Sequence, residues 1–181
     1  MRKTEFHFFT IADFAEEEIW LRNHHKNGWK IVKIIPPGIY IFESCEPQDV
    51  IYRLDFKNSE QTQEYMQMVK DFGWEYVARC VGWLYFRKPA NATESDNEGE
   101  LFSDNESRVE MVSKVIKTRL MPLAVIFLCC VIPNLMRAVS NGMGTASSFF
   151  AVLFGALFII YVYLIVHCGI KLKRIKGRYQ V

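Results

Sequence analysis

The hydrophobic positions in the first half of the chain form short runs whose spacing changes from one run to the next. Residues 5–10 are predicted to form a strand and residues 14–26 a helix. Asp13 is suited to cap the start of this helix, and Gly28 to end it in a left-handed conformation. The apolar side of the helix is expected to comprise Phe14, Ile19, Trp20 and Leu21. The charged residues elsewhere on the helix are Glu16, Glu17, Arg22 and Lys26.

Two β-branched and aromatic runs follow this helix. "WKIVKII" and "GIYIFES" are separated by "PPG", which predicts a β-hairpin with its turn at the two prolines and Gly38. The first quarter of the chain therefore indicates the order strand, helix, strand, strand.

The same order of patterns occurs a second time. "DVIYRLDF" alternates like a half-buried strand, and the next run has helical spacing and ends at Gly73. Its apolar positions are Tyr65, Met66, Val69 and Phe72. "WEYVARCV" and "WLYFRKP" then predict a second hairpin that turns at Gly82.

The two copies agree in spacing as well as in order. Gly28 and Gly73 are 45 positions apart, as are their following tryptophans, and Gly38 and Gly82 are 44 apart. We therefore expect an α+β fold in which a tandem βαββ repeat forms a pseudo-symmetric soluble domain. Strands from both copies would form a sheet, with the helices covering one face.

The second half of the chain contains two long apolar runs. Residues 120–136 lack charge over a length at the short end of what crosses a bilayer, and residues 149–170 are longer. A buried core helix is the alternative for either run. Two adjacent spans joined by a short Gly- and Ser-rich loop predict a transmembrane hairpin, with Pro122 at an entry turn and Pro133 at a kink.

Basic residues indicate how this hairpin is oriented. They lie before the first span and after the second, whereas the connecting loop has only Arg137. Because positive residues are retained on the cytoplasmic side, we expect a multi-pass protein of the cell membrane with both termini in the cytoplasm. The flanking residues are Lys114, Lys117, Arg119, Lys171, Lys173, Arg174, Lys176 and Arg178.

A polar, acidic stretch without large apolar side chains separates the two halves and predicts a flexible linker. Ser103 follows it and is suited to cap the start of a further helix, whose basic residues lie near its far end, as helix polarity favours. The expected divisions are a repeated domain at 1–89, a linker at 90–102, a juxtamembrane helix at 103–119, spans at 120–139 and 149–170, and a basic tail at 171–181.

Composition narrows the functional classes. A net charge of +2 gives no reason to expect nucleic-acid binding, and the five cysteines lack the spacing of a zinc site. His24 and His25 are too close together on a helix to share a metal and are expected to be solvated. Neither Cys45 nor Cys80 lies in a recognisable nucleophile motif. The sequence has no P-loop, GxGxxG or HExxH motif. We therefore expect no enzyme, no metal and no cofactor.

Aromatic residues of the two predicted hairpins are the candidates for a binding site. The two-copy arrangement is similar to the gyrase-inhibitor-like and SOUL-type effector domains, which hold lipophilic ligands between their halves. That resemblance in fold nominates Trp29, Tyr40, Trp74, Tyr76, Trp83 and Tyr85 as ligand-binding residues, with Phe42 and Phe86 beside them. The alternative is that these side chains only pack the core.

Several stretches resemble the bacterial domain-of-unknown-function family 2812. They are "NGWKIVK", "YIFESCEPQDVIYRLDF", "YMQMVKDFGWEYVARCVGWLYFRKP" and "ELFSDNESRVEM", within residues 5–112. The resemblance implies a membrane-anchored protein of Gram-positive bacteria, encoded near a PadR-like transcriptional regulator. It implies no biochemical activity and no catalytic residue.

Two functional hypotheses from different classes follow. The first is a membrane-anchored cytosolic binding or sensing module whose repeated domain takes a lipophilic small molecule or a regulatory protein. The second is a structural accessory subunit whose hairpin docks on a membrane transporter or envelope complex. In both, the lipid bilayer is a partner.

Overall fold

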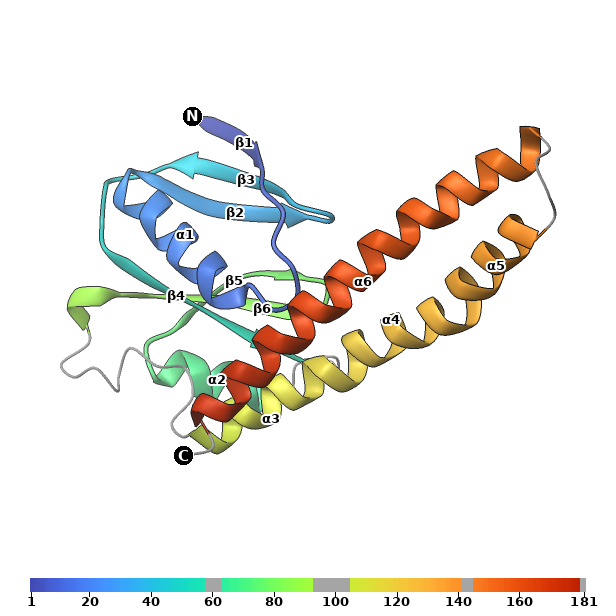
Figure 1. Ribbon diagram of the computed structural model, residues 1–181. Helices are drawn as coiled ribbons and strands as arrows, with labels where there is room; N and C mark the ends of the chain where they lie inside the picture. Colours follow the sequence, from blue (N-terminus) through green and yellow to red (C-terminus); the bar gives the residue numbers. More distant parts are fainter. Residues whose placement is uncertain (58–62, 93–104, 141–144, 180–181) are drawn as a thin grey trace. The chain divides into compact units, whose positions relative to one another are not determined.

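The computed structural model describes residues 1–57, 63–92, 105–140 and 145–179 (Figure 1). Most of the predicted linker lies outside these ranges, as do Ser103, the predicted start of the next helix, and residues 141–144 between the two apolar runs. The chain divides into two compact units, Met1–Met111 and Val112–Val181. Each unit is described by itself.

The first half of the N-terminal unit has the predicted order of elements. Strand β1 (Arg2–Phe6) leads into helix α1 (Phe14–Lys26), which is followed by strands β2 (Trp29–Ile35) and β3 (Ile39–Ser44). They form an antiparallel sheet in the order β1-β3-β2. The predicted first strand at 5–10 was placed too late, because β1 ends at Phe6 and the backbone amide of His7 instead donates to the Gly38 carbonyl in the hairpin turn (2.9 Å).

The second half repeats this order. Strand β4 (Val50–Phe56) precedes helix α2 (Gln63–Asp71), and strands β5 (Glu75–Cys80) and β6 (Trp83–Pro89) follow, with a short 3₁₀ turn η1 (Ala90–Ala92). The strands form a second antiparallel sheet in the order β4-β6-β5. The N-terminal unit is therefore α+β with two three-stranded sheets. The predicted single sheet is not formed, although the edge strands β2 and β5 lie beside each other.

The two halves share local features as well as element order. Both hairpins have an irregular register near the middle of their first strand, at Val32 in β2 and at Val77 in β5. Gly28 and Gly73 both have φ near +80°, which confirms the predicted left-handed helix ends. A common shape for the halves remains a prediction.

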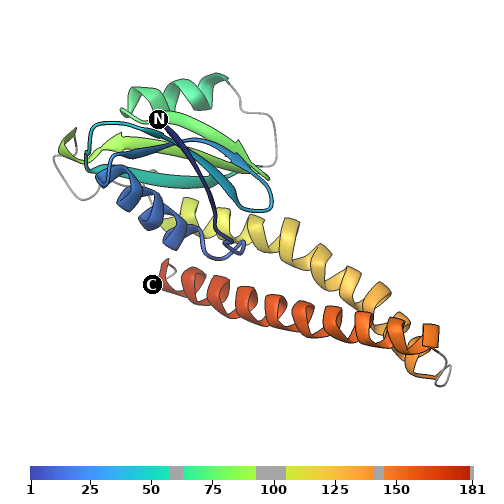
Figure 2. The ribbon, with the colours of Figure 1, turned by 90° about the horizontal axis from the view of Figure 1, so that it is seen from above.

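The two helices lie on opposite faces of the second sheet, not on one face as expected. Side chains alternate along a strand, so odd and even positions of β6 face different layers. Trp83 and Tyr85 face α1, where Trp83 stacks on Phe14, whereas Leu84 and Phe86 pack beneath α2 (Figures 1 and 2). Because both faces of the second sheet are covered, β4 and β6 are buried at almost every position.

Helix α1 packs against both sheets with two different sides. The prediction of one apolar side and one charged side does not describe this arrangement. Glu17 is buried, and Ile19 is exposed. Trp20 contacts the rings of Tyr40 and Phe42 on the first sheet, while Phe14 contacts the second. The charged side predicted from the sequence is therefore partly an interior surface.

Loop contacts hold the start of α1. Asp13 precedes the helix as predicted, but its side chain makes no capping hydrogen bond to it. Its carboxylate accepts hydrogen bonds from the backbone amide and hydroxyl of Thr10, at 2.8 and 2.5 Å. The carboxylate therefore orders the loop after β1.

One continuous helical stretch runs from α3 (Asn105–Val115) through η3 (Ile116–Leu120), α4 (Met121–Ile126) and η4 (Phe127–Val131) to α5 (Ile132–Ser140). The segments η3 and η4 are π-helical, and each ends just before a proline-containing segment. A proline lacks an amide hydrogen and crowds the carbonyl four residues earlier, so a wider turn lets the helix continue. Pro122 therefore lies within the helix and not at an entry turn.

The second long helix of the C-terminal unit is α6 (Thr145–Tyr179). It packs against the first through ring contacts of Phe127 with Phe158 and Tyr161. Val109–Arg137 and Phe149–Gly177 are each long and apolar enough to cross a membrane. Such helices with mostly exposed apolar side chains indicate membrane association.

Candidate groove between helix α2 and strand β5

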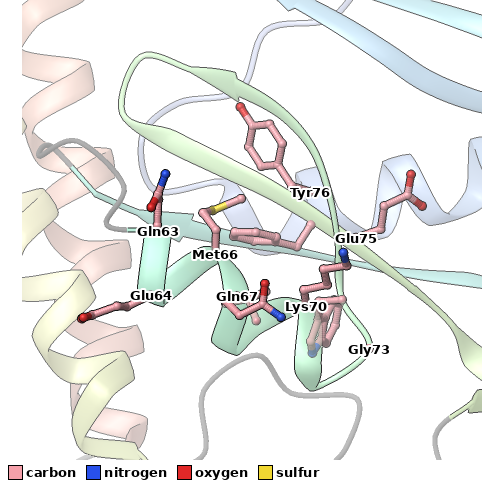
Figure 3. Close-up of a pocket in the computed structure, with 11 residues that line it drawn as sticks. Gln63, Glu64, Met66, Gln67, Lys70, Gly73, Glu75 and Tyr76 are labelled. Carbon is pink, nitrogen blue, oxygen red and sulfur yellow. The ribbon is translucent and has the colours of Figure 1, made fainter.

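An open groove runs between helix α2 and strand β5 of the N-terminal unit (Figure 3). Its volume of about 1010 Å³ is similar to that of clefts that hold drug-sized molecules, roughly 300 to 1,000 Å³. The lining residues are Gln63, Glu64, Met66, Gln67, Val69, Lys70, Gly73, Trp74, Glu75, Tyr76 and Phe86.

The helical spacing of α2 produces one wall of the groove. Gln63, Met66, Gln67 and Lys70 recur at intervals of three and four residues and so share one side of the helix. The adjacent side carries Val69, which packs with Trp74 and Phe86 in the core. This wall is consequently a mixture of amide, thioether and ammonium groups above an apolar base.

The turn after α2 produces the opposite wall. Gly73 reverses the chain in a left-handed conformation, so that Trp74 returns beneath the helix and β5 runs alongside it. Tyr76, which is 40% exposed, contacts the edge of the Phe86 ring from β5. Figure 3 shows Tyr76 and Met66 extending from opposite walls. The groove therefore has an apolar floor of buried side chains, with the exposed ring of Tyr76 beside it.

Charges on the strand side of the groove are largely paired. Glu75 accepts two hydrogen bonds from Arg87, at 2.7 and 2.8 Å, and this pairing lowers the pKa of Glu75. The guanidinium of Arg87 also interacts with the hydroxyl of Tyr52, to which His25 Nδ1 is hydrogen bonded at 2.8 Å. This network fixes β5 to β6 and contributes no free carboxylate to the groove.

A second polar constellation lies inside the N-terminal unit, away from the groove. The Glu17 carboxylate from α1 accepts hydrogen bonds from Tyr40 on the first sheet (2.6 Å) and Tyr85 on the second (2.7 Å). Glu17 is only 6% exposed, and burial raises its pKa above the ordinary value near 4.5. It therefore joins the two sheets through the helix between them.

Replacing Glu17 with glutamine should change how stability depends on pH. A raised pKa means that the folded state binds more protons than the unfolded state above about pH 4.5, so wild-type stability falls as pH rises through the folded-state pKa. The free energy of unfolding of wild type relative to Glu17→Gln should therefore decrease from pH 4 to pH 8. Urea titration followed by tryptophan fluorescence measures it, because all four tryptophans lie before residue 84.

The exposed residue Glu46 provides the matched control. Its replacement by glutamine should leave the difference from wild type nearly constant over the same pH range. A flat profile for Glu17→Gln would show that its carboxyl group titrates at an ordinary pKa.

The six nominated aromatic residues occupy three different surroundings. Trp74 and Tyr76 line the groove. Tyr40, Trp83 and Tyr85 are buried in the layer around α1, and the half-buried Trp29 lies beneath the ammonium of Lys3 at 4.6 Å from the ring centre. The structure does not bring all six to one cleft, and their role in ligand binding remains a prediction.

Several important residues were not nominated from the sequence. Met66 and Gln67 belong to the groove because of their side of α2, and no motif marks them. His25, predicted to be solvated, is buried against Tyr52, with burial lowering its pKa. For Met66, the 45-residue spacing between the two copies was the signal in the sequence that could have marked it. This spacing aligns Met66 with Leu21, a core residue of α1.

Two observations concern the reactive side chains that the structure describes in the N-terminal unit. Burial raises the pKa of the Cys80 thiol, which disfavours the thiolate that a nucleophile requires. Within the described ranges no three His, Cys, Asp or Glu side chains are placed to share a metal ion. What the groove offers chemically is apolar contact with a few orienting polar groups.

Comparison with known proteins gives one match. The family described as "Protein of unknown function (DUF2812)" matches residues 13–126, which is more than half of the chain. This range begins later and ends later than the sequence resemblance, and it includes the start of the first apolar helix. No curated protein and no solved structure matches.

Proposed function

Because the chain belongs to DUF2812, a family of unknown function, we propose its role from geometry: it is a membrane-anchored module that binds a lipophilic small molecule in the α2–β5 groove. The observation that carries the proposal is a groove with the apolar residues Trp74 and Phe86 at its base and the exposed ring of Tyr76 on its wall, beside a helix with further exposed apolar residues. Phe72, at the end of α2, is 69% exposed. Apolar surface grouped in this way is typical of ligand sites.

The proposed duplication explains why this groove is open. Leu21 and His25 of α1 pack against the second sheet, and the positions 45 residues later are Met66 and Lys70, on the groove wall. The equivalent side of α2 thus has no second sheet among the described elements of its unit. We infer that a ligand covers this side of α2, as the second sheet covers the equivalent side of α1.

The membrane helices supply the ligand's route in this proposal. A lipophilic molecule dissolves in the bilayer, and a chain that carries both the spans and the groove meets it at a high local concentration. The bases at both ends of the helical hairpin support a cytoplasmic position for the N-terminal unit. We propose binding and not catalysis because the described lining residues include no Ser, Cys or His.

Photo-crosslinking in cells tests the proposal. A photoreactive amino acid at Gln67, on the exposed groove wall, should capture a small molecule when the full-length protein is irradiated. The matched position is Lys33, an exposed residue of β2 outside the groove, where little capture is expected. Equal capture at the two positions would argue against a groove site.

A third position separates this proposal from the accessory-subunit hypothesis. Val152 in α6 is 74% exposed and lies within an apolar run. Capture of an integral membrane protein at Val152, with nothing specific at Gln67, would favour the accessory role. Capture of a protein at Gln67 would replace the small-molecule ligand with a protein partner.

A further inference from the structure

A buried polar contact attaches helix α2 to the second sheet. The hydroxyl of Tyr65, in the first turn of α2, donates a hydrogen bond of 2.5 Å to Oδ2 of Asp55 in β4. Asp55 is only 2% exposed, and it lies four positions after Ile51, so both residues face the layer beneath α2. A buried carboxylate is costly unless it is paired, so this hydrogen bond fixes the first turn of α2 to β4.

Two further groups hold the Tyr65 side chain in place. The ammonium of Lys57 lies over the Tyr65 ring, and it is 3.7 Å from Oδ2 of Asp55. The Tyr65 ring meets that of Phe86 edge to face, with the ring centres 6.3 Å apart. Burial raises the pKa of Tyr65, so its hydroxyl remains a hydrogen-bond donor at neutral pH.

Tyr65 lies on the side of α2 that faces away from the groove. Helical spacing places Tyr65 beside the exposed residues Met68 and Phe72. The groove wall is the other side of the helix, which carries Gln63, Met66, Gln67 and Lys70 (Figure 3). In the sheet order β4-β6-β5, the strand that holds Asp55 and the strand that forms the opposite groove wall are the two edges. The Tyr65 contact therefore holds α2 toward β4 and away from β5.

We propose that Tyr65 is a positioning residue that keeps the groove open by tying α2 to Asp55. This inference rests on the proposed function, which requires an open groove. Burying apolar surface is favourable, so an untied α2 would move toward β5 and cover the exposed ring of Tyr76. The hydrogen bond opposes this movement, because breaking it takes a donor from a buried carboxylate.

The competing explanation is that the Tyr65 ring only packs against the core. Its contact with Phe86 would then hold α2 without the hydroxyl. Tyr65→Phe separates the two explanations, because it removes the hydroxyl and retains the ring. The position of α2 must be measured without relying on a bound ligand.

Intramolecular crosslinking of the full-length protein in phosphatidylcholine nanodiscs makes this measurement. A diazirine amino acid at position 67 is irradiated, and peptide mapping gives the fraction of protein in which it is linked to residues 75–80 of β5. This fraction should be small with Tyr65 present. In Tyr65→Phe it should rise about tenfold, the factor expected for the loss of a hydrogen bond to a charged group.

Variants of the partner and of a neighbour provide the controls. Asp55→Asn retains an acceptor for the Tyr65 hydroxyl and should retain the low fraction. Asp55→Ala removes the acceptor and should reproduce the result of Tyr65→Phe, and combining the two should add little because they remove the same hydrogen bond. Met68→Ala, at an exposed position on the same side of α2, should have no effect.

The outcomes distinguish the role of Tyr65 from the existence of a ligand. Unchanged links to β5 in Tyr65→Phe would overturn the positioning role, and capture of a small molecule at position 67 in the same variant would retain the ligand site. Links spread over many segments would show that α2 unfolds instead of moving, and would also overturn the positioning role. The expected rise in links to β5, with no small molecule captured when Tyr65 is present, would support the positioning role and count against the ligand.

Discussion

Replacing Phe86 with alanine is expected to lower the free energy of unfolding of the N-terminal unit by about 3 to 5 kcal/mol. Phe86 has no solvent exposure and packs in the core with Val69 and Trp74, so the shorter side chain leaves a cavity under α2. This loss is a large part of the roughly 5 to 15 kcal/mol that stabilises an ordinary domain. Urea titration of the full-length protein, followed by tryptophan fluorescence, measures it.

Tyr76 is the control for this substitution. Its ring contacts that of Phe86, but it is 40% exposed on the groove wall, so Tyr76→Ala should cost less than half as much. Tyr76→Ala should nevertheless reduce crosslinking at Gln67, because it removes part of the wall. Similar stability losses for the two variants would contradict the assignment of Phe86 to the floor and Tyr76 to the wall.

Gly38→Ala is the second substitution with a large expected effect. Gly38 is buried in the turn between β2 and β3, and an added Cβ would stand against the backbone carbonyl oxygen of His7, closer than non-bonded atoms approach. The clash is with backbone, so no side chain can rotate to relieve it. We expect a loss of about 1 to 3 kcal/mol or more, as for other overpacked sites.

The structure also indicates how this loss arises. The His7 amide donates to the Gly38 carbonyl, and separating the two residues to admit a methyl group weakens this hydrogen bond. A matched change is Gly155→Ala in α6, where an added Cβ meets no atom within 4 Å. If Gly38→Ala unfolds at the same urea concentration as wild type, His7 and Gly38 do not approach each other as closely as described.

Much of the fold could be predicted because its signals are local. Gly28 and Gly73 end their helices with positive φ, as expected from glycine's freedom there. The "PPG" and Gly82 turns separate the strands of both hairpins, and the two apolar runs form long helices. Each of these features depends on neighbouring residues in the sequence.

The arrangement of layers could not be predicted in the same way. Glu17 appears in a charged stretch of α1, and only the approach of two tyrosines from different sheets makes its burial tolerable. His25 is likewise accommodated by Tyr52, 27 positions away. Hydrophobic periodicity does not reveal such long-range partners, so it assigned both residues to solvent.

The candidate site shows the same limit. Trp74 and Tyr76 were nominated as aromatic residues and do line the groove, whereas Tyr40 and Tyr85 have side chains directed to Glu17 in the interior. Aromatic character is shared by cores and ligand sites, so composition alone cannot separate them. The groove is defined by the open side of α2, which depends on which layers cover the helix.

The ligand site between α2 and β5 is tested by the mass that becomes attached to a photoreactive amino acid at position 67 when the full-length protein is irradiated in its own membrane. We expect an increment of a few hundred daltons, as for ligands that fill such clefts, at Gln67 and not at Lys33. An unchanged mass at Gln67, or an attached protein chain, would contradict a lipophilic small-molecule site between α2 and β5.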